Sequence, residues 1–164
     1  SLSHADVFSE CSLTMPEETQ QLLITEFYHP YRDSVYSRMT QLLEDYHQVV
    51  HLSVHTFTSI WKGVPREVEI GLLFDNHRST ELDFCKIWKE KLEVMTDKSI
   101  RYNEPYAGAD DGFTTFLRNQ FGEEQYLGLE LEVSQKFDEI QLAELGANLV
   151  ESLKQTMKAY ENRR

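Results

Sequence analysis

The stretch QVVHLSVH, residues 48–55, decides the fold class. Apolar and polar residues alternate along it, which is the period of a β-strand with one buried face. The polar face of this strand would carry His51, Ser53 and His55. We therefore expect a half-buried strand with two histidines on its open side.

Three more stretches have strand character. Residues 68–74 alternate in the same way, and a short strand is expected near residues 100–102, before a loop. Leucines and a valine alternate with polar residues over 127–133, so Glu130 and Glu132 should project from one face.

Spacings of three and four residues predict helices between these strands. One helix should start after Pro16 and reach about residue 28, where Pro30 is expected to interrupt it before a neighbouring helix over 35–46. A further helix is expected over 80–95, with Ser79 as its cap and Glu81 near the positive end of its dipole. Another is expected over 114–120. The last helix should bury an amphipathic stripe of Leu142, Leu145, Leu149, Leu153 and Met157.

Strands that alternate with helices predict an α/β sandwich with a mostly parallel or mixed sheet. A length of 164 residues suits a single domain over 1–164. The sequence contains no repeat, linker or low-complexity tract. It gives no indication of an oligomeric state.

Charge and composition narrow the range of partners. Acidic residues outnumber basic ones 28 to 16, which disfavours a nucleic-acid partner. The sequence has neither a long apolar run nor a signal region, so no membrane partner is expected. Cys11 and Cys85 match no metal-binding spacing, and a buried thiol at Cys85 suits the cytoplasm.

His51, His55, Glu130 and Glu132 are the side chains that could carry chemistry from the strand faces. Their spacing alone favours a merely hydrated sheet face. No zinc-protease helix, phosphate loop, dinucleotide fingerprint or nucleophile elbow accompanies them.

Three segments resemble the N-formylglutamate amidohydrolase family in the same order along the chain. Residues 51–58 look like the family's strand ending in His-Ser-Phe-Thr, with Thr56 in place of Ser. Residues 103–108 look like its Asn-x-Pro-Tyr-x-Gly loop. Residues 126–135 are similar to its strand with a Glu before Val-Asn-Gln, with Ser134 in place of Asn.

The resemblance implies roles for individual residues. His55 would be a zinc ligand and Glu132 the catalytic carboxylate, with Glu130 as the reserve candidate. Asn103 and Tyr106 would line the substrate pocket, although a structural turn explains them equally well. Apart from the resemblance, Arg66 lies near the strand that follows His55 and could attract an anionic substrate, although pairing with Glu67 or Glu69 explains it at least as well.

The resemblance also implies a three-layer, phosphorylase/hydrolase-like fold, related to zinc carboxypeptidases and aspartoacylases. Residues 1–10 look like the stretch just after the family's Asp-Leu-Asn-Arg motif. That motif and an earlier His and Glu that bind zinc are absent from the sequence. We therefore expect a C-terminal portion of a longer protein, inactive or nearly so alone.

The expected activity is zinc-dependent hydrolysis of N-formyl-L-glutamate, or of a similar N-acyl amino acid, to formate and the free amino acid. The small N-acyl amino acid would be the partner of the site. One alternative is a non-catalytic interaction domain that retains the hydrolase core. Another is the same chemistry on a different acyl group or a small peptide amide.

Overall fold

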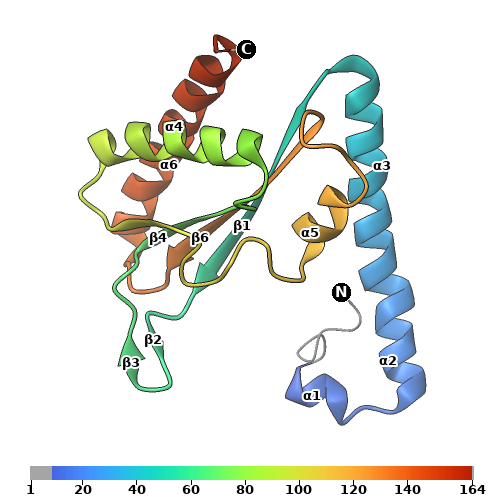
Figure 1. Cartoon of the computed structure of the whole chain (residues 1–164). Coiled ribbons are helices and arrows are strands. Elements are labelled where there is room, and N and C mark those ends of the chain that lie inside the picture. Colours follow the sequence, from blue (N-terminus) through green and yellow to red (C-terminus); the bar gives the residue numbers. More distant parts are fainter. Residues whose placement is uncertain (1–8, 164) are drawn as a thin grey trace.

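A mixed sheet forms the centre of the computed structural model, which describes residues 9–163. Its strand order is β1 (Val49–Phe57), β6 (Tyr126–Ser134), β4 (Ile70–Leu73) and β5 (Ile100–Tyr102). β1 runs parallel to β6, and β4 runs antiparallel to β6 and parallel to β5 (Figure 1). β1 is thus an edge strand of this sheet, and the expected sheet is confirmed.

One face of the sheet is covered by α4 (Ser79–Met95) and α6 (Glu139–Glu161), which pack against each other. The apolar positions of β4 and β6 point to this side and join Phe84, Trp88 and Leu92 in the larger core. All four residues of β4 are buried, because this strand lies between two neighbours and under helices. The alternating sequence predicted one exposed face for this strand, but both faces of β4 are buried.

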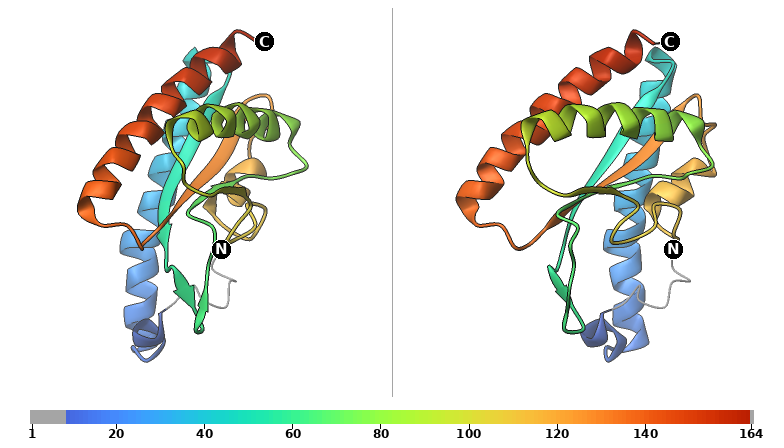
Figure 2. Two further views of the ribbon diagram at one scale, coloured as in Figure 1. Left: turned by 90° about the vertical axis from the view of Figure 1, so that its left-hand side faces the viewer. Right: turned by 60° about the vertical axis from the view of Figure 1, so that its left-hand side comes forward.

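The other face is covered by α3 (His29–Asp45) and α5 (Phe113–Arg118). A smaller core joins them to the sheet through Met39, Leu117 and Tyr126. Figures 1 and 2 show these helices on the side of the sheet opposite α4 and α6. Helices on both faces make a three-layer α/β sandwich, as expected.

The interruption expected at Pro30 is wrong. α2 (Glu17–Leu23), a π-helical turn η1 (Ile24–Tyr28) and α3 follow one another without a break, and the α2 end of the rod extends past the sheet (Figure 2). In the wide turn the His29 N–H donates to Ile24 O, five residues earlier. A proline has no N–H and clashes with the preceding turn of a regular helix, and this locally wider turn accommodates it. A short helix, α1 (Glu10–Leu13), precedes the rod.

The apolar stripe expected on α6 is confirmed in its middle, where Leu145 is buried and Leu149 and Leu153 pack against the larger core, but not at its two ends. Leu142 and Met157 are 43% and 36% exposed, whereas Ser152 and Thr156 are fully buried. Ser152 Oγ accepts a hydrogen bond of 3.0 Å from Trp88 Nε1, so a polar contact lies in the seam between α4 and α6. At the start of α4, Arg78 occupies the cap position and Ser79 is the first helical residue.

A hairpin of β2 (Ile60–Trp61) and β3 (Val64–Pro65) follows β1. Its two-residue turn has positive φ at both Lys62 (51°) and Gly63 (80°), which suits the twist of paired strands. No described helix is long and apolar enough to cross a membrane. Residues 1–8, on which most of the N-terminal resemblance falls, lie outside the described residues.

Candidate functional site

The register between β1 and β6 sets polar side chains beside each other on the face covered by α3 and α5. His55 lies opposite Glu132, and Ser53 lies opposite Glu130. The parallel pairing explains this, because residues two apart on each strand share a face. The two residues that the resemblance singled out, 77 positions apart in sequence, are thus direct neighbours.

Glu132 has the features of a functional carboxylate. It is only 5% exposed, and its Oε2 is buried without a hydrogen-bond partner among the described residues. Burial raises the pKa of Glu132 and nearby Glu130 adds to the rise, while the charges of His55 and Arg66 oppose it. A buried carboxylate oxygen normally has a partner, so this one indicates a place for water, a metal ion or substrate.

His55 lies at the exposed end of the same row. Its Nε2 is 2.7 Å from Ser53 Oγ, and the second ring nitrogen forms no hydrogen bond with residues 9–163. Serine orients the ring, much as an outer partner orients a metal-binding histidine.

Glu130, the reserve candidate, is engaged elsewhere. Its Oε1 accepts a hydrogen bond of 2.5 Å from Thr114 Oγ1 on α5. Thr114 thus holds one oxygen of Glu130, whereas the buried Oε2 of Glu132 has no hydrogen-bond partner among the described residues.

His51, the other histidine of β1, belongs to the smaller core. Its Nδ1 is 2.7 Å from Tyr126 OH, and its ring meets the ring of Phe113 edge-on at 6.3 Å. Burial lowers the pKa of His51. These contacts give His51 a structural role.

Arg66 and Tyr106 meet near this pair. Arg66 Nη1 donates to Tyr106 OH over 3.2 Å, and the guanidinium carbon lies 5.1 Å from the tyrosine ring centroid. It also lies over the rings of Phe57 and Trp61. The alternative pairing with a neighbouring glutamate is not formed within residues 9–163, because Glu69 pairs with Lys136 at 2.8 Å instead.

Asn103 holds the loop in place. Its Oδ1 accepts hydrogen bonds from the N–H groups of Phe74 (2.9 Å) and Gly108 (3.1 Å). Its Nδ2 donates to Asn76 Oδ1 over 3.2 Å. The side-chain amide therefore joins the end of β4 to the loop, and the structural reading of Asn103 accounts for all its contacts among the described residues.

Two glycines let the loop approach the sheet. A Cβ on Gly71 would lie 2.1 Å from Glu104 O and 3.2 Å from Glu132 Cβ. A Cβ on Gly108 would lie 2.2 Å from the backbone nitrogen of Phe74. The loop thus crosses directly over β4 beside Glu132, which no periodicity in the sequence reveals.

A buried ion pair between Arg118 and Glu81 holds the loop at Gly108. Arg118 Nε donates to Glu81 Oε1 over 3.0 Å, and the arginine also donates to Gly108 O and Gly128 O over 2.5 Å each. Glu81 in turn accepts from the N–H groups of Gly128 and Asp75, both at 2.9 Å. The sequence placed Glu81 only near a helix end, and 37 residues separate it from its partner.

Metal-binding groups are incomplete in the described part. Within residues 9–163 no group of three His, Cys, Asp or Glu side chains could hold a metal ion. His55 offers one nitrogen donor beside the carboxylate of Glu132. These residues fit one side of a metal centre and do not form a whole one.

A helix-flanked mixed sheet with polar groups gathered near one end of adjacent strands is the usual setting of a ligand site in an α/β protein. A comparison with family models gives a more specific result. The model described as N-formylglutamate amidohydrolase matches residues 4–137, so the chain belongs to the N-formylglutamate amidohydrolase family.

A solved structure agrees with this assignment at the level of the fold. The crystal structure of gene product Atu2144 from Agrobacterium tumefaciens is similar, with a TM-score of 0.72 and 26% sequence identity. The match covers 90% of this chain and 57% of that chain, so this chain spans little more than half the length of that protein. None of the curated proteins matches the chain.

Proposed function

We propose that this chain carries one side of the active site of a zinc-dependent amidohydrolase that cleaves N-formyl-L-glutamate or a similar N-acyl amino acid. The single observation behind the proposal is the pairing of His55 with Glu132, whose Oε2 is buried without a partner among the described residues. Membership of the family supplies the reaction class.

Glu132 would act as the general base. The pKa of Glu132 is raised toward neutral pH, and a carboxylate with such a pKa can both take a proton and return it. Its open oxygen would take a proton from the attacking water and deliver it to the leaving nitrogen. Glu130, bound to Thr114, would add negative charge nearby without taking part.

His55 would be one zinc ligand through a ring nitrogen, with Ser53 orienting the ring. Zinc bound there would polarise the substrate carbonyl and lower the pKa of a bound water toward ~7. A catalytic zinc normally takes about three protein ligands. The other donors would have to come from outside the described residues, so we expect this chain alone to be inactive or nearly so.

Arg66 and Tyr106 would bind the anionic end of the substrate. Their contact keeps the guanidinium beside the site, and no carboxylate within residues 9–163 pairs with it. A guanidinium edge is well suited to a carboxylate. Asn103 would support this end of the pocket by fixing the loop.

The second candidate is a non-catalytic interaction domain with the same core. The incomplete metal set among the described residues and the departures at Thr56 and Ser134 favour it. A cytoplasmic location and the absence of nucleic-acid and membrane partners stay predictions from the sequence.

The deciding experiment measures zinc-dependent release of formate from N-formyl-L-glutamate by an N-terminally extended form of the protein. His55→Ala and Glu132→Gln should each lower kcat/KM by about 100-fold or more. His47→Ala, at an exposed position before β1, is the matched control and should keep full activity.

Metal analysis of the same extended form separates the candidates. Stoichiometric zinc without formate release would point to another acyl substrate. A folded protein that binds no zinc would support the interaction domain. If the 164-residue chain turned over with added zinc, the expectation that it needs further ligands would be wrong.

A further inference from the structure

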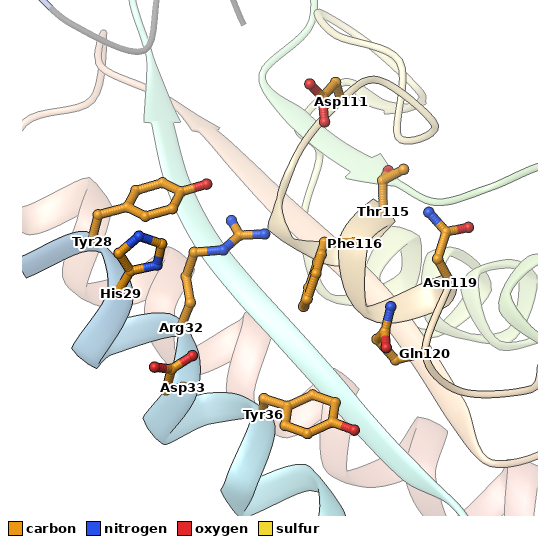
Figure 3. A pocket seen from close by; sticks show the side chains of 10 residues that line it. All are labelled: Tyr28, His29, Arg32, Asp33, Tyr36, Asp111, Thr115, Phe116, Asn119 and Gln120. Carbon is orange, nitrogen blue, oxygen red and sulfur yellow. The ribbon is translucent and has the colours of Figure 1, made fainter. Parts of the chain in front are cut away.

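A cavity of about 600 Å³ lies between the η1–α3 part of the helical rod and α5 (Figure 3). Aromatic and amide side chains line much of it, among them Tyr28, Tyr36, Phe116, Asn119 and Gln120. This size, with apolar walls and a few polar groups, is typical of small-molecule sites. His55, Glu132, Arg66, Asn103 and Tyr106 do not line it, so it is separate from the candidate amidohydrolase site.

Arg32 is the charged group of this cavity. Its guanidinium carbon lies 4.2 Å from the ring centroid of Phe113, 4.7 Å from that of Phe116 and 5.0 Å from that of Tyr28. Figure 3 shows its side chain reaching from the helix toward Phe116. Rings from both helices therefore hold one half-buried cation in place.

The N–H groups of Arg32 remain available. Its contacts with described residues are these three rings, and none of its nitrogens forms a hydrogen bond or an ion pair with residues 9–163. Arg78, another half-buried arginine, instead donates hydrogen bonds to three backbone carbonyls. A guanidinium offers five donors in a planar fork that suits a carboxylate.

The other titratable groups restrict the ligand. Asp33 lines the cavity from the helix and Asp111 from the loop before α5, while His29 and the two tyrosines complete the set. The negative charge of Asp33 in the cavity wall disfavours a multiply charged anion. The ring faces of Tyr36 and Phe116 favour a flat apolar body.

We propose that this cavity binds a small monocarboxylate with a flat, apolar body. Its carboxylate would pair with the Arg32 fork and its body would lie against the aromatic wall. The amides of Asn119 and Gln120 offer further hydrogen bonds to polar substituents.

Binding of benzoate to the 164-residue chain tests this proposal. Calorimetry measures the affinity, and the NMR signals of the Arg32 Nε–H and of the Asn119 and Gln120 amides locate the bound benzoate. Arg32→Gln should weaken binding about tenfold or more, since a charge-assisted pair is lost. Arg38→Gln, on the exposed side of the same helix, should leave it unchanged. If Arg32→Gln does not fold, Arg32→Lys replaces it and should weaken binding by several-fold, because the planar fork is lost.

Three results would overturn the proposal: no saturable benzoate binding to the folded chain, equal binding by its neutral analogue benzamide, or unchanged affinity in the Arg32 variant. Dianionic phosphate that binds more tightly than benzoate would also contradict it. The assay needs neither zinc nor turnover. Its failure is therefore distinct from failure of the amidohydrolase proposal.

Discussion

Gly71 sets the distance between the loop and Glu132. Any side chain there would meet Glu104 O and approach Glu132 Cβ, so the strand tolerates only hydrogen at this position. Gly71→Ala should destabilise the fold by about 1–3 kcal/mol, because the loop must move or the strand must bend. Urea unfolding measures the change.

Gly146→Ala is the matched control. Nothing lies within 4 Å of a Cβ at that position in α6, and alanine favours a helix more than glycine does. The variant should gain about 0.5–1 kcal/mol. A loss at Gly146 as large as that at Gly71 would contradict the steric argument.

The carboxylate of Glu69 should make the free energy of unfolding depend on pH in the acidic range. Burial alone would raise its pKa, but hydrogen bonds from Lys136 and from the Ser99 N–H outweigh burial and lower it. A lowered folded pKa stabilises the fold above the unfolded value and loses this effect as pH falls through the folded value.

Glu69→Gln should therefore cost about 1–2 kcal/mol at neutral pH, and the difference from wild type should shrink below about pH 4. Unfolding in urea between neutral and acid pH checks this. Glu67→Gln, at an exposed position two residues earlier, is the control and should change stability by less than about 0.5 kcal/mol at neutral pH. A difference that stays constant with pH would show that the charge of Glu69 is not responsible.

At the level of elements, period and composition predicted the four strands of the central sheet and most helices well, but not the two short strands of the β2–β3 hairpin. β5 has the predicted limits, and β1, β6 and α4 differ by one or two residues. The break at Pro30 and the two ends of the α6 stripe were predicted wrongly, for different reasons. A π-helical turn differs from an α-helix in which backbone groups form hydrogen bonds, and the residue types do not encode this difference. Which residues of α6 are buried depends on where α4 crosses it.

The seam between α4 and α6 provides a test at this scale. Ser152→Ala would leave the buried Trp88 indole N–H without its acceptor, which should cost about 1–3 kcal/mol. Gln155→Ala, exposed on the same helix, should change stability by less than about 0.5 kcal/mol. Thermal unfolding of the two variants compares them, and equal effects would contradict a role for the indole contact.

The Glu81–Arg118 pair holds together parts of the whole molecule, because it joins α4, α5, β6 and the loop at Gly108. Removing one partner leaves the other charge buried, so Arg118→Met should cost about 3–5 kcal/mol. Replacing both residues with apolar ones should recover part of this loss. Equilibrium unfolding measures it.

An exposed ion pair is the control for this prediction. Lys86 and Asp83 lie 3.6 Å apart with exposed side chains, and Lys86→Met should cost at most about 1 kcal/mol. Similar losses in the two cases would mean that burial does not set the strength of the Arg118 pair.

Long-range pairing explains what the sequence could and could not predict about the site. His55, Glu132 and Tyr106 were singled out by resemblance and Arg66 by its position after the first strand. Strand register pairs His55 with Glu132, and the loop path brings Tyr106 to Arg66. The partners of Asn103, the glycine contacts and the Arg118 network each join segments far apart in the chain. No local pattern marks such contacts, because each residue type has many equally common uses.

The position of β1 at the edge of the sheet should also affect the hydrogen exchange of its backbone amides. Successive N–H groups of a strand point to opposite sides, so only alternate amides of Val49–Phe57 can pair with β6. In deuterated water, residue-resolved exchange along this strand should therefore alternate between slow and fast. If another polypeptide strand docks along the edge, the fast amides become slow and the alternation disappears.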